Sequence, residues 1–474
     1  MNQTLRRLRH TVLPIMLAGL AGCSSLSLED QLQQANADTA EFTGVKLQLA
    51  LNSEQREYMQ QRADVLLTTP LSSAAAVELA LINSPAFQAI LARSWADGAQ
   101  AAQDGRLPNP VFSFERIRTS DELEIGRALS LGLLDLILWP QRLQTASRRI
   151  DQVQIRLASE VVDAVTQVRE AWVRAVAAQQ QLTYARQIVD GARASAELAR
   201  RLQGAGNFSR LERLRQHSFY AEATAQLAAA QQQSIGSREK LVRHLGLTSD
   251  QAQQLQLPER LPELPLQPLA GEALGGRALR DRLDMRLALA ELDGAAREQG
   301  LEGIHSYTDV ELDLRYDTVF DKADGHRSNP RGLEIALSMP VFDWGDLRRD
   351  ALNARTLTAA LNMEATARAA RSHLREQYSA YHNAYDIARH YQQEILPLRQ
   401  RIAEENLLRY NGMFISVFDL LSDAQENIRT VMAAMAAQEQ FWLSDAALQS
   451  SLMGRPKTTE IGARAVNAVA ADAH

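Results

Sequence analysis

The stretch Asp309-Val310-Glu311-Leu312-Asp313-Leu314-Arg315-Tyr316 alternates between polar and apolar residues without a slip. A period of two over eight residues predicts a β-strand, with Val310, Leu312, Leu314 and Tyr316 on one face and Asp309, Glu311, Asp313 and Arg315 on the other. After a polar loop at residues 317–330 the alternation returns, with Leu333, Ile335, Leu337 and Met339 on one face and Glu334, Ala336 and Ser338 opposite. The stretch therefore predicts a β-hairpin.

Such two-faced strands are typical of transmembrane barrels, whose outer face is apolar and whose inner face is polar. The alternative is an antiparallel sheet with one wet face in a soluble domain. In a barrel, we expect Asp309, Glu311, Asp313 and Glu334 to face the lumen. Symmetry would multiply them into acidic rings that favour cations, or they would simply form a wetted wall that selects nothing.

The composition of the 474 residues favours long helices, because aromatic residues make up 5% and there are only 14 prolines and 24 glycines. A net charge of −6 argues against nucleic acid as a partner. No run of eighteen apolar residues follows the amino terminus, so no membrane-spanning helix is expected in the mature chain. Phosphate loops, HExxH and nucleophile elbows are missing from the sequence, and we expect neither an enzyme nor a cofactor.

Residues 1–22 read as a signal peptide, with Arg6, Arg7 and Arg9 before a short apolar segment. The following Leu20-Ala21-Gly22-Cys23 resembles a bacterial lipobox, which makes Cys23 the predicted lipidation site and the outer membrane the predicted destination. The alternative is an ordinary signal peptide with a chance cysteine. Cys23 is the only cysteine, so no intramolecular disulfide is possible.

The rest of the chain divides into two similar halves. Residues 23–70 are predicted to form a lipid-anchored N-terminal extension, an extended arm outside the body with a possible helix at 54–67. The first repeat, 71–257, contains a helix at 73–104 interrupted at Pro85, strands at 111–118 and 124–133, and helices at 141–203 and 209–245. A proline-rich linker, 258–271, precedes the second repeat, 272–454, and residues 455–474 are predicted to be a disordered tail.

Corresponding positions in the two halves lie at nearly constant spacing, which marks a tandem duplication. Ser416 follows Ser209 by 207 residues, and Ile335 follows Leu129 by 206. Ser209 with Glu212, and Ser416 with Asp419, predict capping boxes that start the two return helices. The second half departs from the first at Pro397, which should kink or locally end its helix.

Lengths and hydrogen-bond closure predict the architecture. Helix 141–203 would span about 95 Å, and its return partner of about 55 Å needs helix 73–104, about 48 Å, stacked on its end. Four strands per chain cannot close a barrel in lipid, where no edge can stay unpaired. Three copies would supply twelve strands, continued by long helical columns.

These features together resemble the outer-membrane factor (TolC-like) efflux family over roughly residues 71–453. The resemblance rests on the lipobox, the duplication, Leu107-Pro108-Asn109-Pro110, Met339-Pro340-Val341-Phe342-Asp343-Trp344-Gly345, and Tyr410-Asn411-Gly412 followed by Ser416 and Asp419-Leu420-Leu421. It implies a mainly α fold with a small β part: a long α-helical barrel plus four strands per chain in a shared transmembrane β-barrel. It further implies a homotrimeric passive conduit that works with a periplasmic adaptor and an inner-membrane pump.

The resemblance also implies site residues at the periplasmic end. Asp419 matches a gating aspartate ring and Tyr410 a gating tyrosine, Asp423 lies one residue beyond the second ring position, and Ile415 replaces an arginine partner. The alternative role of Asp419 is that of a helix cap. The expected adaptor contacts are the turn residues Gly204, Asn207, Ser209, Asn411, Gly412 and Ser416, which could instead be plain helix reversals.

Two further alternatives remain at this stage. A periplasmic coiled-coil adaptor or scaffold lipoprotein would share the helices but have no pore, although adaptors carry one helical hairpin and this chain predicts two. Asp321, Asp324 and His326 in the loop 317–330 could suggest a metal site, but a solvated loop is the preferred interpretation. No metal is therefore expected.

Overall fold

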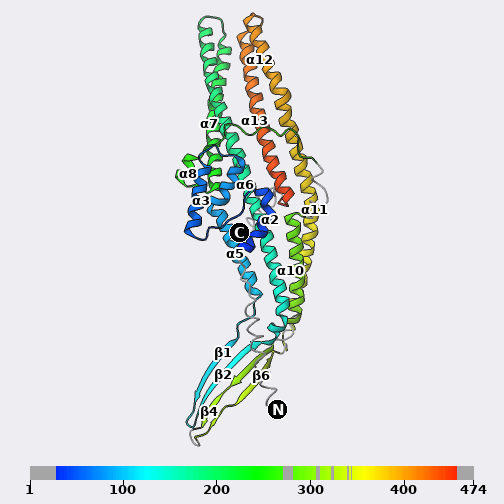
Figure 1. The fold of residues 1–474 in the computed structure, drawn as a ribbon. Helices are drawn as coiled ribbons and strands as arrows, with labels where there is room; N and C mark the ends of the chain where they lie inside the picture. Colours follow the sequence, from blue (N-terminus) through cyan, green and yellow to red (C-terminus); the bar gives the residue numbers. More distant parts are fainter. Residues whose placement is uncertain are drawn as a thin grey trace, which may run out of the picture.

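The computed structural model describes residues 28–270, 281–305, 310–321, 325–338, 341–342 and 344–455. The molecule is elongated, with the strands at one end and two helical hairpin ends at the other (Figure 1). The helices are α2 (Leu28–Thr43), α3 (Ser53–Leu66), α4 (Ser73–Asn83), α5 (Pro85–Asp104), α6 (Leu133–Gly204), α7 (Arg210–Leu245), α8 (Ser249–Gln254), α10 (Leu283–His305), α11 (Asp346–His390), η3 (Tyr391–Ile395), α12 (Leu396–Asn411) and α13 (Val417–Met453). The strands are β1 (Val111–Arg118), β2 (Glu122–Gly132), β3 (Val310–Tyr316), β4 (Thr318–Asp321), β5 (Arg327–Ser328) and β6 (Arg331–Leu337).

The strands form one antiparallel sheet. β1 pairs with β2, β2 pairs with both β3 and β4, β3 pairs with β6, and β4 pairs with β5. β3 and β4 follow one another along β2, interrupted at Asp317, so the described strands occupy four lanes, as predicted. The expectation of a polar loop over 317–330 was wrong, because Thr318-Val319-Phe320-Asp321 continues the strand with residues that favour extended backbone.

Helix α6 is the longest of the described helices. It has 72 residues and is therefore about 108 Å long. Its predicted start at residue 141 was wrong: the helix begins at Leu133, directly after β2, and Pro140 lies inside it. Proline removes only one backbone donor, so the flanking turns can continue. One face of the helix, with residues spaced by three or four positions, is buried at Leu157, Val161, Val165, Val168 and Trp172.

The N-terminal segment is part of the core, which corrects the prediction of an external arm. Leu32, Ala35 and Phe42 of α2 are buried with the apolar residues of α4 and α6. Their spacing of three and seven places them on one face of a helix. The other residues of α2 are mostly polar and include several glutamines, so the sequence alone did not reveal this apolar face.

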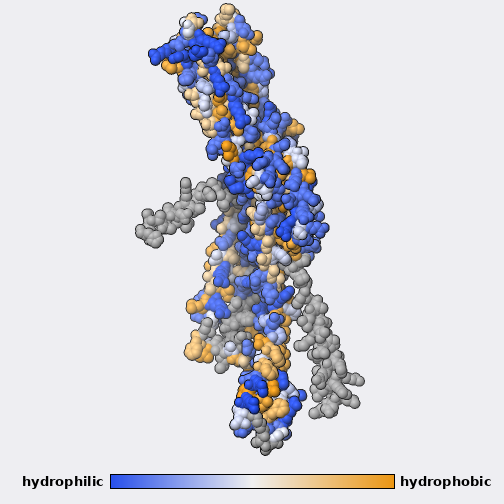
Figure 2. Space-filling model, turned by 90° about the vertical axis from the view of Figure 1, so that its left-hand side faces the viewer, coloured by the Kyte–Doolittle hydropathy of each residue, from blue (hydrophilic) through white to orange (hydrophobic). Residues whose placement is uncertain are grey.

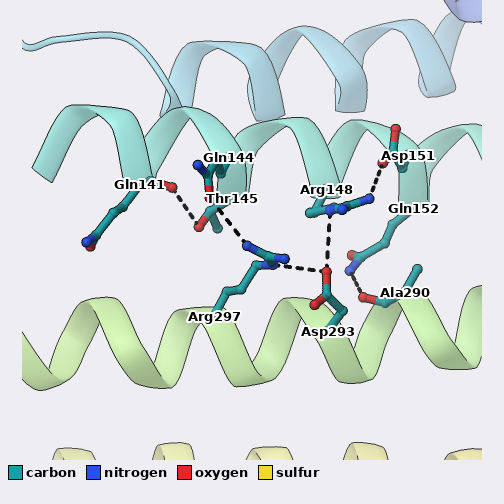
Figure 3. A network of polar contacts seen from close by, with 9 residues as sticks. All are labelled: Gln141, Gln144, Thr145, Arg148, Asp151, Gln152, Ala290, Asp293 and Arg297. Carbon is teal, nitrogen blue, oxygen red and sulfur yellow. Dashed lines mark hydrogen bonds and ion pairs between the residues drawn. The ribbon is translucent and has the colours of Figure 1, made fainter.

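The two halves of the chain meet along α6 and α10 through a polar network (Figure 3). Asp293 Oδ2 of α10 forms an ion pair with Arg148 Nε of α6 at 3.4 Å and accepts from Arg297 Nε at 3.0 Å. Gln152 of α6 donates to the carbonyl of Ala290 at 2.6 Å. This network joins the repeats along the part of the shaft nearest the sheet.

Helices α4 and α5 meet at a 57° bend at Ser84. Within the described ranges, no individual helix combines the length and apolar character that crossing a bilayer requires, whereas the bent α4–α5 pair meets both conditions by length and composition. Ser72 caps α4 by accepting from the Ala75 amide.

The second repeat differs from the first at the predicted place. Helix α11 passes through a π-helical turn, η3, into α12, whose second residue is Pro397. Upstream of η3, the Tyr381 hydroxyl oxygen accepts from the Leu269 amide at 3.1 Å, and the Tyr385 hydroxyl donates to the Pro265 carbonyl at 3.0 Å. These hydrogen bonds hold the linker against α11, just before the α-helix gives way to the π-helical turn.

Candidate functional site

The polar face of the sheet brings together the predicted lumen residues that are described. Asp313 is the register partner of Ser130 on β2 and of Glu334 on β6, and Glu311 is the partner of Gly132 and Ala336. Leu314 pairs with Leu129 and Leu333 on the opposite face. The two-faced character of the sheet is confirmed by this register, since directly paired residues project to the same side. Asp309 lies outside the described residues.

A charge cluster on this polar face was not foreseen. Arg315 lies 2.8 Å from Asp317 through its Nε, and its Nη2 lies 3.7 Å from Glu124 and 3.8 Å from Glu115. The sequence showed Arg315 on the polar face but could not show its neighbours, which come from other strands. One arginine thus meets carboxylates from β1 and β2 at the break between β3 and β4.

Large apolar side chains are exposed where the helices meet the sheet. Ile137 is 64% exposed, Phe342 99% and Trp344 61%. In Figure 2 hydrophobic colour gathers toward the sheet end, whereas hydrophilic colour dominates the middle of the shaft. Aromatic residues at this level are typical of a membrane interface.

The first hairpin tip lies between α6 and α7. Gly204 ends α6, and Gly206 has a left-handed φ of 80° that suits glycine. Ser209 caps α7: its hydroxyl accepts from the Glu212 amide at 3.2 Å, and Glu212 accepts from the Ser209 amide at 2.6 Å. The predicted capping box is confirmed.

The second tip, between α12 and α13, repeats this arrangement. Asn411 ends α12 and Gly412 is its C-cap. The Ser416 hydroxyl accepts from the Asp419 amide at 3.2 Å, while Asp419 Oδ2 accepts from the Ser416 amide at 3.0 Å and hydroxyl at 2.7 Å. These hydrogen bonds, chiefly from the Ser416 side chain, lower the pKa of Asp419. The alternative role of Asp419 as a helix cap is therefore realised, and its side chain is also exposed.

The other two predicted gate residues have different surroundings. Asp423 is mostly buried beside Arg399 of α12, with Oδ1 3.9 Å from Nη1, and the same guanidinium lies 3.0 Å from Glu426. Tyr410 is 38% exposed, and its carbonyl accepts the Met413 amide at 2.9 Å. Arg399 was missed because it lies on the partner helix, 24 residues before Asp423.

Asp321 of the predicted loop lies in β4, and its amide donates to the His326 carbonyl at 3.0 Å. Asp324 and Cys23 lie outside the described residues. Within the described part of the chain, no three His, Cys, Asp or Glu side chains are grouped so that they could hold a metal ion.

Solved structures share this fold over most of their length. A membrane protein from Pseudomonas aeruginosa is 18% identical, with a TM-score of 0.67, over 86% of this chain and 95% of that one. CusC is 15% identical, with a TM-score of 0.66, over 83% and 92% of the two chains. VceC from Vibrio cholerae is 15% identical, with a TM-score of 0.65, over 85% and 99%. The fold is therefore that of the TolC-like channel-tunnels.

Residues 76–247, from α4 to the end of α7, match the family model described as outer membrane efflux protein, whereas no curated protein matches the sequence. Over residues 76–247 the chain is therefore similar to the outer membrane efflux proteins.

Proposed function

We propose that three copies of this chain form one outer-membrane channel that passively carries solutes delivered by a periplasmic adaptor and an inner-membrane pump. The observation that carries the proposal is the open sheet. β1 and β6 are its outer lanes among the described strands, and they run in opposite directions because each successive pairing is antiparallel. Joining β1 of one copy to β6 of the next therefore continues the same antiparallel pattern.

The apolar face of the sheet supports a lipid-facing surface on the outside of this channel. The row formed by Phe112, Leu129, Leu314 and Leu333 crosses all four lanes. An open hydrophobic sheet of this kind has unpaired edges that lipid cannot satisfy, so closure between copies follows. On the inner face, Glu311, Asp313 and Glu334 would line the conduit.

Conductance of the purified protein in planar lipid bilayers tests the proposal. We expect discrete channel openings after insertion of the detergent-solubilised protein. A variant in which Leu314 and Leu333 are both replaced by Asp places charges on the lipid face and should fail to insert. A wild-type protein that never conducts under any voltage or salt condition would remove the channel function.

Anchoring through Cys23 is a second part of the proposal, supported by the lipobox-like Leu20-Ala21-Gly22-Cys23. Cys23→Ala should abolish incorporation of labelled palmitate, because the thiol is the only available acyl acceptor of its kind in the chain. Full labelling of the variant would exclude lipidation at this residue. The Ser24→Ala protein serves as the control and should label normally.

A further inference from the structure

The two faces of the sheet carry charges of opposite sign. Side chains alternate along each strand and paired residues project to the same side, so the register assigns each described strand residue to one face. The face of Asp313 carries one arginine, Arg315, and the carboxylates of Glu115, Glu122, Glu124, Glu311, Asp321 and Glu334. The opposite, apolar face has no carboxylate among the described strand residues, but it has five arginines: Arg116, Arg118, Arg127, Arg327 and Arg331.

The arginines mark one end of the apolar band. β1 and β2 join at the end of the sheet farthest from the helices (Figure 1), and the five arginines lie toward that end. Arg127 pairs with Phe114, and Arg331 pairs with Tyr316, one row beyond the row that contains Leu129. From the Leu129 row to the helices, every described strand residue on this face is apolar.

Three of the arginines lie over aromatic rings of the same face. Arg127 Cζ is 5.8 Å and Arg331 Cζ is 5.7 Å from the centroid of the Tyr316 ring. Arg327 Cζ is 5.2 Å from the centroid of the Phe320 ring. The ring attracts the positive charge and limits the motion of the side chain, while N–H donors at the edge of the guanidinium stay free for another partner.

These positive charges have no carboxylate partner within the described part of the chain. Arg127 donates to the Thr318 hydroxyl at 3.3 Å, and the nearby carboxylates lie on the other face with Arg315. An arginine on a lipid-facing strand surface is costly inside the hydrocarbon and is tolerated near the polar headgroups. A ligand that lies at the headgroup level and is anionic would supply the missing charge.

The choice of arginine indicates which anion this surface fits. No lysine occurs on this face among the described strand residues, although lysine would reach water equally well. The guanidinium fork matches phosphate oxygens in a bidentate geometry that an ammonium group cannot form. Neighbouring strands lie about 4.8 Å apart, so guanidinium groups from adjacent lanes can reach one phosphate. A phosphomonoester, with three acceptor oxygens and a charge of about −1.5 to −2, can pair with more than one arginine.

We propose that Arg127 and Arg331, on either side of Tyr316, bind the phosphomonoester group of a lipid in the outer leaflet. Arg116, Arg118 and Arg327 extend this arginine site toward the strand ends. This inference rests on the proposed function, which places the apolar face in lipid. In the proposed oligomer β1 of one copy lies beside β6 of the next, so the arginines of the two edges come together and one lipid bridges two copies.

The test measures binding of fluorescently labelled lipid A, carrying both of its phosphates, to the purified, detergent-solubilised protein. The same lipid after enzymatic removal of its phosphates is the comparison ligand, and we expect it to bind at least about tenfold more weakly. Arg127→Gln with Arg331→Gln should weaken binding of the phosphorylated lipid by about tenfold or more. Arg127→Lys with Arg331→Lys keeps the charge but not the fork, and should weaken binding by about threefold.

Two further variants control for net charge and for folding. Arg93→Gln with Arg106→Gln removes the same charge from exposed positions outside the strands, and should leave the affinity within about twofold. If the Arg127→Gln, Arg331→Gln protein does not assemble, Arg118→Gln with Arg327→Gln replaces exposed side chains at the strand ends. This second variant should weaken binding by about threefold or more.

The outcomes separate the arginine site from the proposed function. Equal binding of the phosphorylated and dephosphorylated lipids, or equal binding by wild type and an assembled glutamine variant, would overturn the site. Displacement of the label by phosphatidylglycerol as readily as by unlabelled lipid A would exclude a phosphomonoester preference. Full displacement by millimolar inorganic phosphate would identify a site for the free ion and also overturn the proposal. A protein that conducts in bilayers without discriminating these lipids loses only the arginine site, whereas one that binds lipid A selectively but never conducts loses only the channel.

Discussion

Asp445 of α13 is a carboxyl group held in a largely buried network. Its Oδ2 accepts from Gln449 Nε2 at 2.7 Å, and Gln449 Oε1 accepts from Arg169 Nη1 at 2.8 Å. Arg169 of α6 also donates to the Phe42 carbonyl at 2.6 Å. Burial raises the pKa of Asp445 to about 6, and the charge of Arg169 opposes this shift. Three helices, α2, α6 and α13, therefore meet at a group that titrates near neutral pH.

The raised pKa predicts how stability depends on pH. The folded chain binds the Asp445 proton more tightly than the unfolded chain. The contribution of Asp445 to the free energy of unfolding is therefore fully present below pH 3.8 and is lost as pH rises through about 6. Asp445→Asn should remove this dependence and stabilise the protein at pH 7.5 by up to about 3 kcal/mol. Thermal unfolding followed by circular dichroism between pH 4 and 8 measures it, with Asp190→Asn, an exposed position on α6, as the control. An unchanged pH profile in Asp445→Asn would contradict the prediction.

The predicted gate carboxylates, Asp419 and Asp423, allow a separate test at the same scale. Asp419→Asn keeps an acceptor for the Ser416 amide and hydroxyl, so it removes the charge without removing the helix cap. Combined with Asp423→Asn, it should raise single-channel conductance about twofold and weaken block by divalent cations. Ser416→Ala disrupts the cap but retains both carboxylates, and should conduct as wild type. Equal conductance and block in the double variant would exclude these carboxylates from the gate.

At the level of elements, the second helical hairpin contains a π-helical turn, η3, whereas α6 of the first hairpin is α-helical throughout. Pro397 has no amide to donate, and its ring would clash with the carbonyl of Gln393 in an α-helix. The π-helical turn η3, which includes Gln393, lies at this point. No residue of η3 or α12 is buried, whereas Tyr381 and Tyr385 of α11 are 2% exposed. A segment with buried tyrosines thus precedes a segment without buried residues that packs against α13.

Pro397→Ala should restore α-helical winding and slow amide hydrogen exchange in α12. We expect at least about threefold slower exchange there and a melting temperature higher by a few degrees, because a proline inside a helix costs about 3 kcal/mol before relief by the wider turn. Pro140→Ala in α6, where the helix continues without a π turn, should leave exchange in α12 unchanged. Faster exchange in α12 of Pro397→Ala would show that the proline stabilises this segment.

Local signals explain which elements could be predicted. The capping boxes at Ser209 and Ser416 and the strand alternation at 310–316 are encoded within a few residues, and the structure contains them. The burial of α2 depends on α6, more than a hundred residues away, and its polar composition concealed it. The pairing of Asp423 with Arg399 depends in the same way on how α12 and α13 align, which no local pattern specifies.

At the scale of the whole molecule, one chain has a long shaft and an incomplete sheet. The described strands span four lanes with β1 at one side and β6 at the other. The helical columns are held within the chain by the α6–α10 network and by the core around α6. Among the described strands, β1 and β6 each leave one edge unpaired, and the proposed oligomer would pair these edges with other copies of the same chain.

Native mass spectrometry of the mature protein, released gently from detergent micelles, tests the shared sheet most directly. The account predicts a particle of three chains that remains intact after this gentle release and separates into single chains only when the sample is heated. A single chain of about 50 kDa that stays in solution without any detergent would contradict it.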